Sequence, residues 1–359
     1  MLYPFFFALF FVVSNFFAKN SKFFIIFVLP LCVMFSTFQY GMGDYFDYQR
    51  LFDGYTFSNF AIPFFTSFEH GGTGHEFVFA SLMSVFSYFH FPYWFFLFVV
   101  SIITIGLKLF FFYRFSPIFI ASLIIYFSFV FFKDMTQLRG STASSFILLS
   151  SLYIHKKNPI KYIFMVLLAS GFHVFSLLAL PVYWISNSRY SPFILILLLC
   201  CSYVFWVFGG VVDVFLNTFN EGQFGYIYKK IHGYYYISGS TEINPLGFGS
   251  IFHIFLILYC IFFRSELKKI SGMFWPLFVF YAYGFLCYVI FFDLSLLAYR
   301  SLEIFSHTSL ALIFAFVIYS KRGIKRLAAI ILLFLYSSFF FFQRIEYYEN
   351  YSTILAVNS

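Results

Sequence analysis

Long apolar segments alternate with short polar segments along most of the chain. The apolar segments are long enough to cross, or nearly cross, a hydrocarbon core of about 30 Å. They cover residues 2–17, 23–40, 93–112, 117–132, 136–154, 162–185, 193–215, 248–263, 273–292, 304–319 and 327–342. This pattern predicts an all-α polytopic membrane protein with about 10 to 12 transmembrane helices, folded as a single integral membrane domain over residues 1–359.

The polar segments are of two kinds, which predicts an orientation. Six short ones are basic: AKNSK, KLFFFYRFS, HKKNPIK, SNSRY, RSELKK and SKRGIKR. The positive-inside rule places these six in the cytoplasm, Lys108 and Arg114 included. The longer loops at about 41–75 and 217–247, and a turn at Lys133 and Asp134, then face the outer side.

Two apolar segments do not fit a simple crossing. Counting residues 75–90 as a crossing would place KLFFFYRFS on the outer side, so this segment is expected to be a re-entrant or interfacial helix. Residues 162–185 have basic sequence at both ends. They are predicted to form two short helices, broken within ASGFH at 169–173, with the break on the outer side.

Composition excludes a soluble globular protein. Hydrophobic residues make up 62% of the chain and charged residues only 10%, whereas soluble domains carry about 25% charged residues. The formal net charge of +8 therefore reflects orientation in a lipid bilayer, and no nucleic-acid partner is expected. The five cysteines lie in apolar segments without CxxC spacing, so they are expected to be small lipid-facing or core residues.

Ionisable groups at or near membrane depth are costly, and each is a functional candidate by default. The segment GDYFDYQR contains Asp44, Asp47 and Arg50. The two aspartates would share a helix face if residues 40–51 are helical, and either could act as a general base. Glu76 opens an apolar helix and would face its positive N-terminal dipole. The histidines of HGGTGHE lack HExxH spacing, so no metal is expected.

Three further candidates lie in or beside apolar segments. Gln137 and Arg139 are expected about one turn inside a helix, where the arginine either snorkels to the surface or grips an anionic phosphate. His173 lies in the predicted helix break. Arg300 and Glu303 in LAYRSLEIF are three residues apart and are expected to pair.

These segments resemble a known family. GDYFDYQRLF, HEFVFASL, the run from QLRGSTASS to FHVFSLLALP, and LAYRSLEIF are similar to segments of the EpsG-like family of bacterial polysaccharide polymerases, which includes Wzy-type O-antigen polymerases. The resemblance implies a glycosyltransferase with a GT-C-like fold in the bacterial inner membrane, acting on the periplasmic side. Its substrate would be an oligosaccharide linked to undecaprenyl pyrophosphate.

In that chemistry Arg139 and Arg300 would hold the lipid diphosphates, one of three carboxylates would be the base, and no cofactor would be needed. The expected catalytic residues are Asp44, Asp47, Glu76, Arg139 and Arg300, and the expected substrate-binding residues are Arg50, Gln137, His173, Tyr299 and Glu303. A flippase for the same lipid-linked sugar and an O-antigen ligase remain alternatives. A chain-length regulator in the membrane is a candidate partner.

Overall fold

The computed structural model describes residues 21–41, 43–54, 76–219, 225, 228, 231–233, 235, 243–349, 352 and 353. The predicted helix at 2–17 and most of the two long loops lie outside these residues. The helices before the middle of the chain are α2 (Ser21–Thr37), α3 (Tyr45–Gly54), α5 (Phe77–Tyr88), α6 (Tyr93–Phe115), α7 (Phe119–Ile125), α8 (Phe131–Thr136), α9 (Leu138–His155) and α10 (Pro159–Ser170). Those that follow are α11 (Val182–Asn187), α12 (Ser191–Val207), α13 (Val211–Thr218), α15 (Phe248–Phe262), α16 (Arg264–Ile270), α17 (Phe274–Ile290), α18 (Ser295–Ser301), α19 (His307–Ser320) and α20 (Gly323–Glu349).

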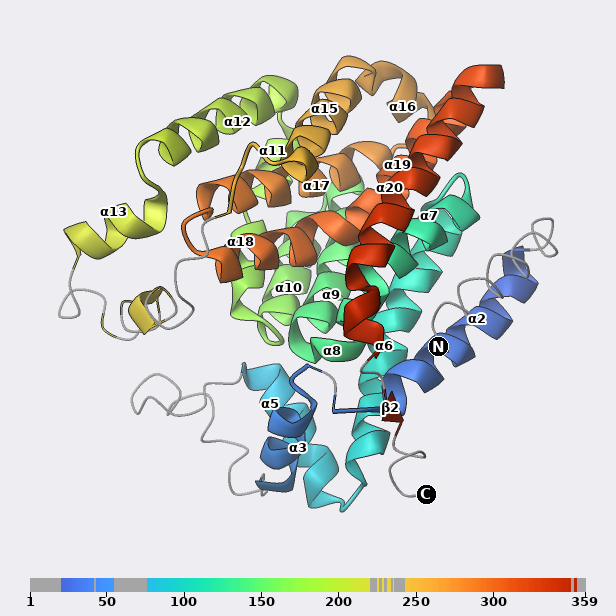
Figure 1. Cartoon of the computed structure of the whole chain (residues 1–359), viewed down its shortest axis with the longest axis vertical. Coiled ribbons are helices and arrows are strands. Elements are labelled where there is room, and N and C mark those ends of the chain that lie inside the picture. Colours follow the sequence, from blue (N-terminus) through green and yellow to red (C-terminus); the bar gives the residue numbers. More distant parts are fainter. Residues whose placement is uncertain are drawn as a thin grey trace.

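One short β-ladder ties the two ends of the described chain together. Strands β1 (Gln39–Tyr40) and β2 (Ser352–Thr353) pair in antiparallel fashion. The segment after α2 is thereby held against the segment after α20. The all-α architecture expected from the apolar pattern is otherwise confirmed (Figure 1).

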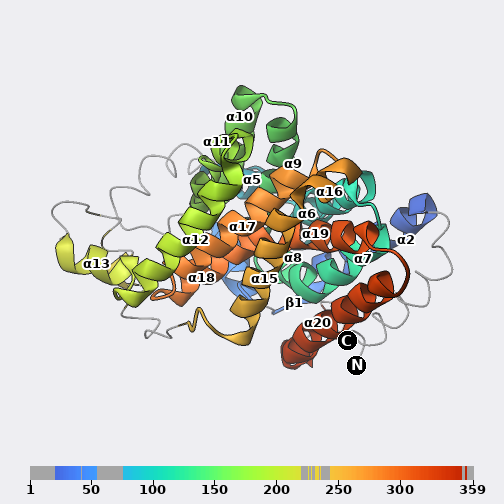
Figure 2. The same cartoon turned by 90° about the horizontal axis from the view of Figure 1, so that it is seen from above.

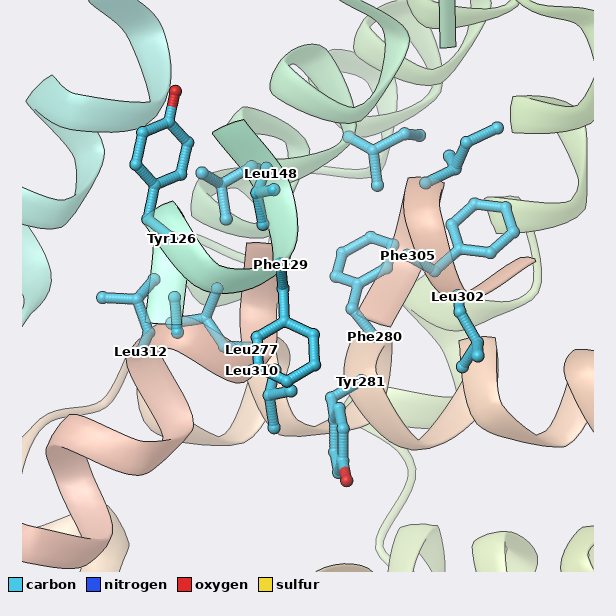
Figure 3. Close-up of a cluster of buried hydrophobic side chains, with 14 of the residues drawn as sticks. Tyr126, Phe129, Leu148, Leu277, Phe280, Tyr281, Leu302, Phe305, Leu310 and Leu312 are labelled. Atoms are coloured by element: carbon cyan, nitrogen blue, oxygen red, sulfur yellow. The ribbon is translucent and has the colours of Figure 1, made fainter. Parts of the chain in front are cut away.

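Two helices form the centre of the molecule. Helices α17 and α19 lie in the middle in Figure 2, with α10, α12 and α20 towards the outside. Nearly every side chain of both is buried, as expected for helices that are apolar on all sides and surrounded by others. Phe280, Tyr281 and Leu310 from these helices pack with Phe129 and Phe305 in the core shown in Figure 3.

Small residues let α9 approach α6 closely. Thr104 and Thr142 share a hydroxyl hydrogen bond of 2.7 Å, and the Ser145 hydroxyl donates to the Thr104 carbonyl at 2.9 Å. Small and hydroxyl residues at such contacts are typical of helices that pack in lipid. Large apolar side chains cover the outside of the molecule instead, among them Phe255 and Phe262 of α15, so the chain is a membrane protein.

Three described helical segments are long and apolar enough to cross a membrane, Tyr93–Phe115, Phe119–Thr136 and Ser295–Ser320. A fourth is possible if α15 and α16, bent by 78° relative to each other, count as one. The 12-residue α5 rises about 18 Å, which agrees with the expected re-entrant or interfacial helix. The count of 10 to 12 crossings stays a prediction.

Several apolar segments are interrupted. Helix α10 ends at Ser170, and a 3₁₀ helix, η3, begins at Val174 and ends at Ala179, so the break predicted at 169–173 is confirmed. Two π-helical turns, η2 (Tyr126–Val130) and η4 (Leu302–Ser306), interrupt the segments 119–136 and 295–320. Such turns often occur at functional sites.

The expected placement of Lys108 is wrong. KLFFFYRFS is not a loop, because α6 continues to Phe115. Lys108 is fully buried and forms an ion pair with Asp134, which lies within α8 and not in a turn. Tyr126 also donates to the Asp134 carboxylate, at 2.7 Å. A buried charge requires such partners. The sequence around Lys108 does not indicate that its partner lies on another helix.

Candidate functional site

Helices α8 and α9 meet at a break in which three polar side chains diverge. Gln137 leaves helical geometry, with φ −120° and ψ 66°, and a new helix starts at Leu138. Lys133 and Gln137 on one side of the break contact residues of α18 and η4, whereas Arg139 on the other contacts α3 and the start of α5. The break therefore joins two charged clusters.

The first cluster is built around Arg139. Its Nε donates to the Tyr48 hydroxyl at 2.8 Å and its Nη1 donates to Glu76 Oε2 at 2.8 Å. The guanidinium also lies over the Tyr48 ring, 5.6 Å from its centroid, a favourable cation–π geometry. The Arg139 side chain is 25% exposed and that of Glu76 is 12% exposed. The guanidinium is thus held in place without being sealed from solvent or substrate.

Tyr48 lies on the buried face of α3, which is amphipathic. Burial raises the pKa of its phenol above the ordinary value of 10.0, Arg139 lowers it, and Asp44 raises it further. The net shift is upward, so the phenol stays neutral at physiological pH and serves Arg139 as a hydrogen-bond acceptor. Helices α3 and α5 lie side by side at one end of the molecule (Figure 1).

Glu76 precedes the first residue of α5 with extended backbone geometry, and its side chain does not cap that helix. Its Oε1 instead accepts the backbone N–H of Val174 at 3.3 Å, while Oε2 accepts from Arg139. The carboxylate thus connects three segments that are far apart in the sequence. It lies at the helix N-terminus as expected, but its hydrogen-bond partners come from elsewhere.

The break after α10 and the start of α5 fit tightly together. The carbonyl of Gly171 accepts the N–H groups of Val78 and Phe79 at 2.9 and 3.1 Å. A Cβ on Gly171 would lie 2.3 Å from Val78 Cγ2, so only glycine allows this approach. Glycine at this position therefore sets where Glu76 stands.

The second cluster is built around Arg300. Its Nη1 donates to Gln137 Oε1 and, at 3.3 Å, to Glu303 Oε2. Glu303 Oε1 lies 2.8 Å from Lys133 Nζ. The predicted pairing of Arg300 with Glu303 is confirmed. One carboxylate is thus shared by two cations from different helices.

Gly140 lies between the two clusters. A Cβ built there would be 3.4 Å from Arg300 Nη1 and 3.8 Å from His173 Cδ2. Arg300, His173 and the first turn of α9 therefore meet at one point. A small cavity beside Gly140 has room for about one water molecule. The charged and amide side chains that line it are Lys108, Lys133, Asp134, Gln137 and Glu303.

A sequence model of the EpsG family matches residues 21–356. The chain belongs to the EpsG family. The amylovoran biosynthesis protein AmsC of Erwinia amylovora is 25% identical to this EpsG protein over 274 residues, which cover 74% of this chain and 68% of AmsC. No solved structure matches the chain.

Not every residue expected at the site of this EpsG protein lies in the two clusters. Helix α3 begins at Tyr45 and not near residue 40, because β1 and two glycines with positive φ, Gly41 and Gly43, precede it. Asp44 therefore precedes the helix, where it is partly buried and its carbonyl accepts the N–H of Tyr48 at 3.0 Å.

Three of the expected residues point to the surface. Asp47 and Arg50 form an ion pair of 3.6 Å, with their side chains 72% and 80% exposed. Tyr299 is half exposed and packs on Tyr288, with ring centroids 6.0 Å apart. These side chains lie apart from the contacts that join Arg139 and Arg300 to their neighbours, and their proposed roles stay predictions.

Two residues of the clusters were not among the expected site residues. Tyr48 lies within GDYFDYQR, where its spacing from Tyr45 and Phe52 on the buried face of α3 could have indicated an inward direction. Lys133 was assigned to a turn. Its contact with Glu303, 170 residues away in sequence, has no local signal.

Proposed function

We propose that this EpsG family member is a membrane glycosyltransferase that polymerises a bacterial polysaccharide. Its family membership and the name of its relative AmsC support a role in polysaccharide biosynthesis. In this proposal it transfers a glycan from undecaprenyl pyrophosphate to a lipid-linked repeat unit, at the periplasmic face of the inner membrane. A chain-length regulator is a proposed partner.

The observation that carries the proposal is that two arginines flank the first turn of α9. Arg139 belongs to that turn, and Arg300 Nη1 lies 3.4 Å from the position of a Cβ built on the next residue, Gly140. Both guanidiniums lower the pKa of the Tyr48 phenol, against the larger effect of burial. The two guanidiniums come from helices 161 residues apart in sequence, and each is only partly exposed. Planar guanidinium donors suit phosphate oxygens. Two of them beside one helix turn supply part of the positive charge that lipid diphosphates require.

The reaction assigns a task to each charge. The acceptor hydroxyl oxygen forms a bond to the anomeric carbon of the donor glycan, and the bond from that carbon to the diphosphate oxygen breaks. The diphosphate leaves with the bonding electron pair, and Arg139 and Arg300 stabilise its developing charge. The hydroxyl proton passes to a carboxylate base. The arginines would thus fill the electrostatic role that divalent cations have in other transferases, so a chelator should leave activity unchanged.

Among the three carboxylates proposed as the base, we favour Asp44. Both oxygens of Glu76 already accept hydrogen bonds, from Arg139 and from Val174, which suits a residue that positions the guanidinium. Asp47 is engaged with Arg50 on the surface. Asp44 is partly buried and close enough to Tyr48 to shift the pKa of its phenol, so it lies at the edge of the Arg139 cluster.

The test replaces each arginine with alanine in a strain that lacks the native gene and resolves the polysaccharide by gel. Arg139→Ala and Arg300→Ala should each leave only single repeat units. Arg189→Ala is the matched control, because that arginine is exposed between α11 and α12 and belongs to neither cluster, and it should retain the ladder of chain lengths. Immunoblots of the membranes confirm that all variants accumulate. A normal ladder from both site variants would refute the proposal.

The same strain separates the alternative activities. Loss of a polymerase leaves single repeat units on the lipid carrier at the periplasmic face. Loss of a flippase traps them at the cytoplasmic face, and loss of a ligase leaves long polymer on the carrier. Access of a membrane-impermeant oxidant to the lipid-linked sugar distinguishes the first two outcomes, and the gel distinguishes the third.

A further inference from the structure

Lys133 belongs to the Arg300 cluster by geometry, because its ammonium pairs with Glu303, and the proposed reaction does not yet use it. It lies in α8, one turn before Gln137, whose N–H bonds to the Lys133 carbonyl at 2.8 Å. Its side chain is 25% exposed and lines the same cavity as Gln137, Gly140 and Glu303. The ammonium is thus directed into the molecule beside Arg300 and has not snorkelled away to the surface.

The neighbouring residue holds Lys133 in this position. Asp134 is fully buried between Lys108 and Tyr126. That anchorage fixes the short helix α8 against α6. The side chain of the preceding residue, Lys133, therefore projects in a different direction. Lys133 accordingly reaches Glu303 in η4. An ion pair at membrane depth therefore sets the position of a partly accessible lysine.

Glu303 bridges two cations with its two oxygens. Oε1 faces Lys133 Nζ at 2.8 Å and Oε2 faces Arg300 Nη1 at 3.3 Å. A diphosphate is a larger anion with more acceptor oxygens, and it can accept from the same two cations. The carboxylate and the diphosphate would then compete for one pair of donors.

We propose that Lys133 is a third diphosphate-binding cation of the site and that Glu303 is an internal anion which the diphosphate displaces. This inference rests on the proposed function, because it supposes that a lipid diphosphate binds at Arg139 and Arg300. It assigns opposite effects to the two halves of one ion pair. Lys133 strengthens diphosphate binding and Glu303 weakens it.

The experiment measures binding of farnesyl diphosphate to the purified full-length protein in nanodiscs by isothermal titration. Lys133→Met should weaken binding about tenfold, the cost of losing one charge-assisted hydrogen bond, and Lys133→Arg should restore it. Glu303→Gln should strengthen binding several-fold. Lys161→Met, at an exposed lysine on α10, is the matched control and should bind like the wild type.

The outcomes separate this inference from the proposed function. If Lys133→Met binds like the wild type, or if Lys133→Met and Glu303→Gln both weaken binding, the pair is only structural and the inference is overturned. In either case Arg139→Ala and Arg300→Ala still report on the proposed function. If these two arginine variants bind as the wild type does, or if the wild type does not bind the probe, both the proposed function and this inference fail. Farnesyl monophosphate keeps the isoprenyl chain and lacks the second phosphate, so its binding measures what that phosphate contributes.

Discussion

Adjacent residues of α8 take part in two ion pairs that differ in burial. The Asp134 pair with Lys108 has no exposed side-chain surface, whereas Lys133 and Glu303 are 25% and 12% exposed. If one charge of a fully buried pair is removed, the other stays desolvated without compensation, which is strongly destabilising. A partly exposed pair can exchange a partner for a ligand. Burial thus separates charges that hold the fold from charges available to a substrate.

The same contrast appears on a larger scale. The surface pair of Asp47 and Arg50 is mostly exposed, and such pairs contribute about 0 to 1 kcal/mol. The Arg139 and Glu76 pair is intermediate in exposure. We therefore expect the buried pair to govern stability, the intermediate pairs to govern activity, and the exposed pair to govern neither.

The largest effect is expected from breaking the buried pair. Asp134→Ala or Lys108→Met leaves one charge buried without its partner, at a cost of about 3 to 5 kcal/mol. The variants should melt at lower temperature in detergent or fail to accumulate in the membrane. The double variant Lys108→Met/Asp134→Leu removes both charges and should be closer to the wild type than either single variant. Single variants that melt like the wild type would show that the buried pair does not govern stability.

The next effect concerns activity without a loss of stability. Asp44→Asn keeps a side chain that can stand before a helix but removes the proposed base, so polymerisation should fall about a hundredfold or more. Asp47→Asn is the matched control on the exposed face of α3 and should stay within about twofold. Polymer yield and melting temperature are measured for both. Equal losses from the two variants would exclude Asp44 as the base.

A smaller effect tests the close approach that positions Glu76. Gly171→Ala places a Cβ against Val78, so the start of α5 must move, at a cost of about 1 to 3 kcal/mol. The loss of activity should be larger than the loss of stability alone explains, because Glu76 shifts relative to Arg139. Gly54→Ala, whose added Cβ has nothing within 4 Å, should leave both quantities unchanged. A Gly171 variant with full activity would show that this packing does not position the site.

The smallest effect is expected at Tyr48. Tyr48→Phe removes the acceptor for Arg139 Nε but keeps the ring beneath the guanidinium, a loss of about 1 kcal/mol. The raised pKa of the phenol means that its proton is bound more tightly in the folded state. Its contribution to stability is therefore constant below pH 10 and is lost as pH rises beyond it. Melting curves from pH 8 to 11 should show a steeper decline for the wild type than for the variant.

Some features of the site follow from local spacing. The pairing of Arg300 with Glu303 requires only a helical separation of three residues. The break between α10 and η3 was predicted from the ASGFH segment and the basic sequence at both ends. Glu76 lies at the start of its helix. This was predicted from its position directly before the apolar residues of the segment HEFVFASL. In each case the interacting residues are neighbours in the chain.

The contacts that build the site could not be predicted in this way. Arg139 meets Glu76 across 63 positions and Arg300 meets Gln137 across 163. Asp44 and Asp47 were expected on one helix face. Because Gly41 and Gly43 have positive φ, the helix begins only at Tyr45, so Asp44 lies before the helix and Asp47 within it.

The sequence by itself determined that this is an all-α membrane protein, because the composition allows no water-facing surface over most of the chain. It also determined the family, through segments spread over nearly all its length. Only the tertiary structure decided which charges are paired. The sequence around Lys108 does not show whether this lysine ends an apolar helix or lies within one. Its role follows from Asp134 on another helix, because a buried charge is stable only where the packing of helices brings its partner to it.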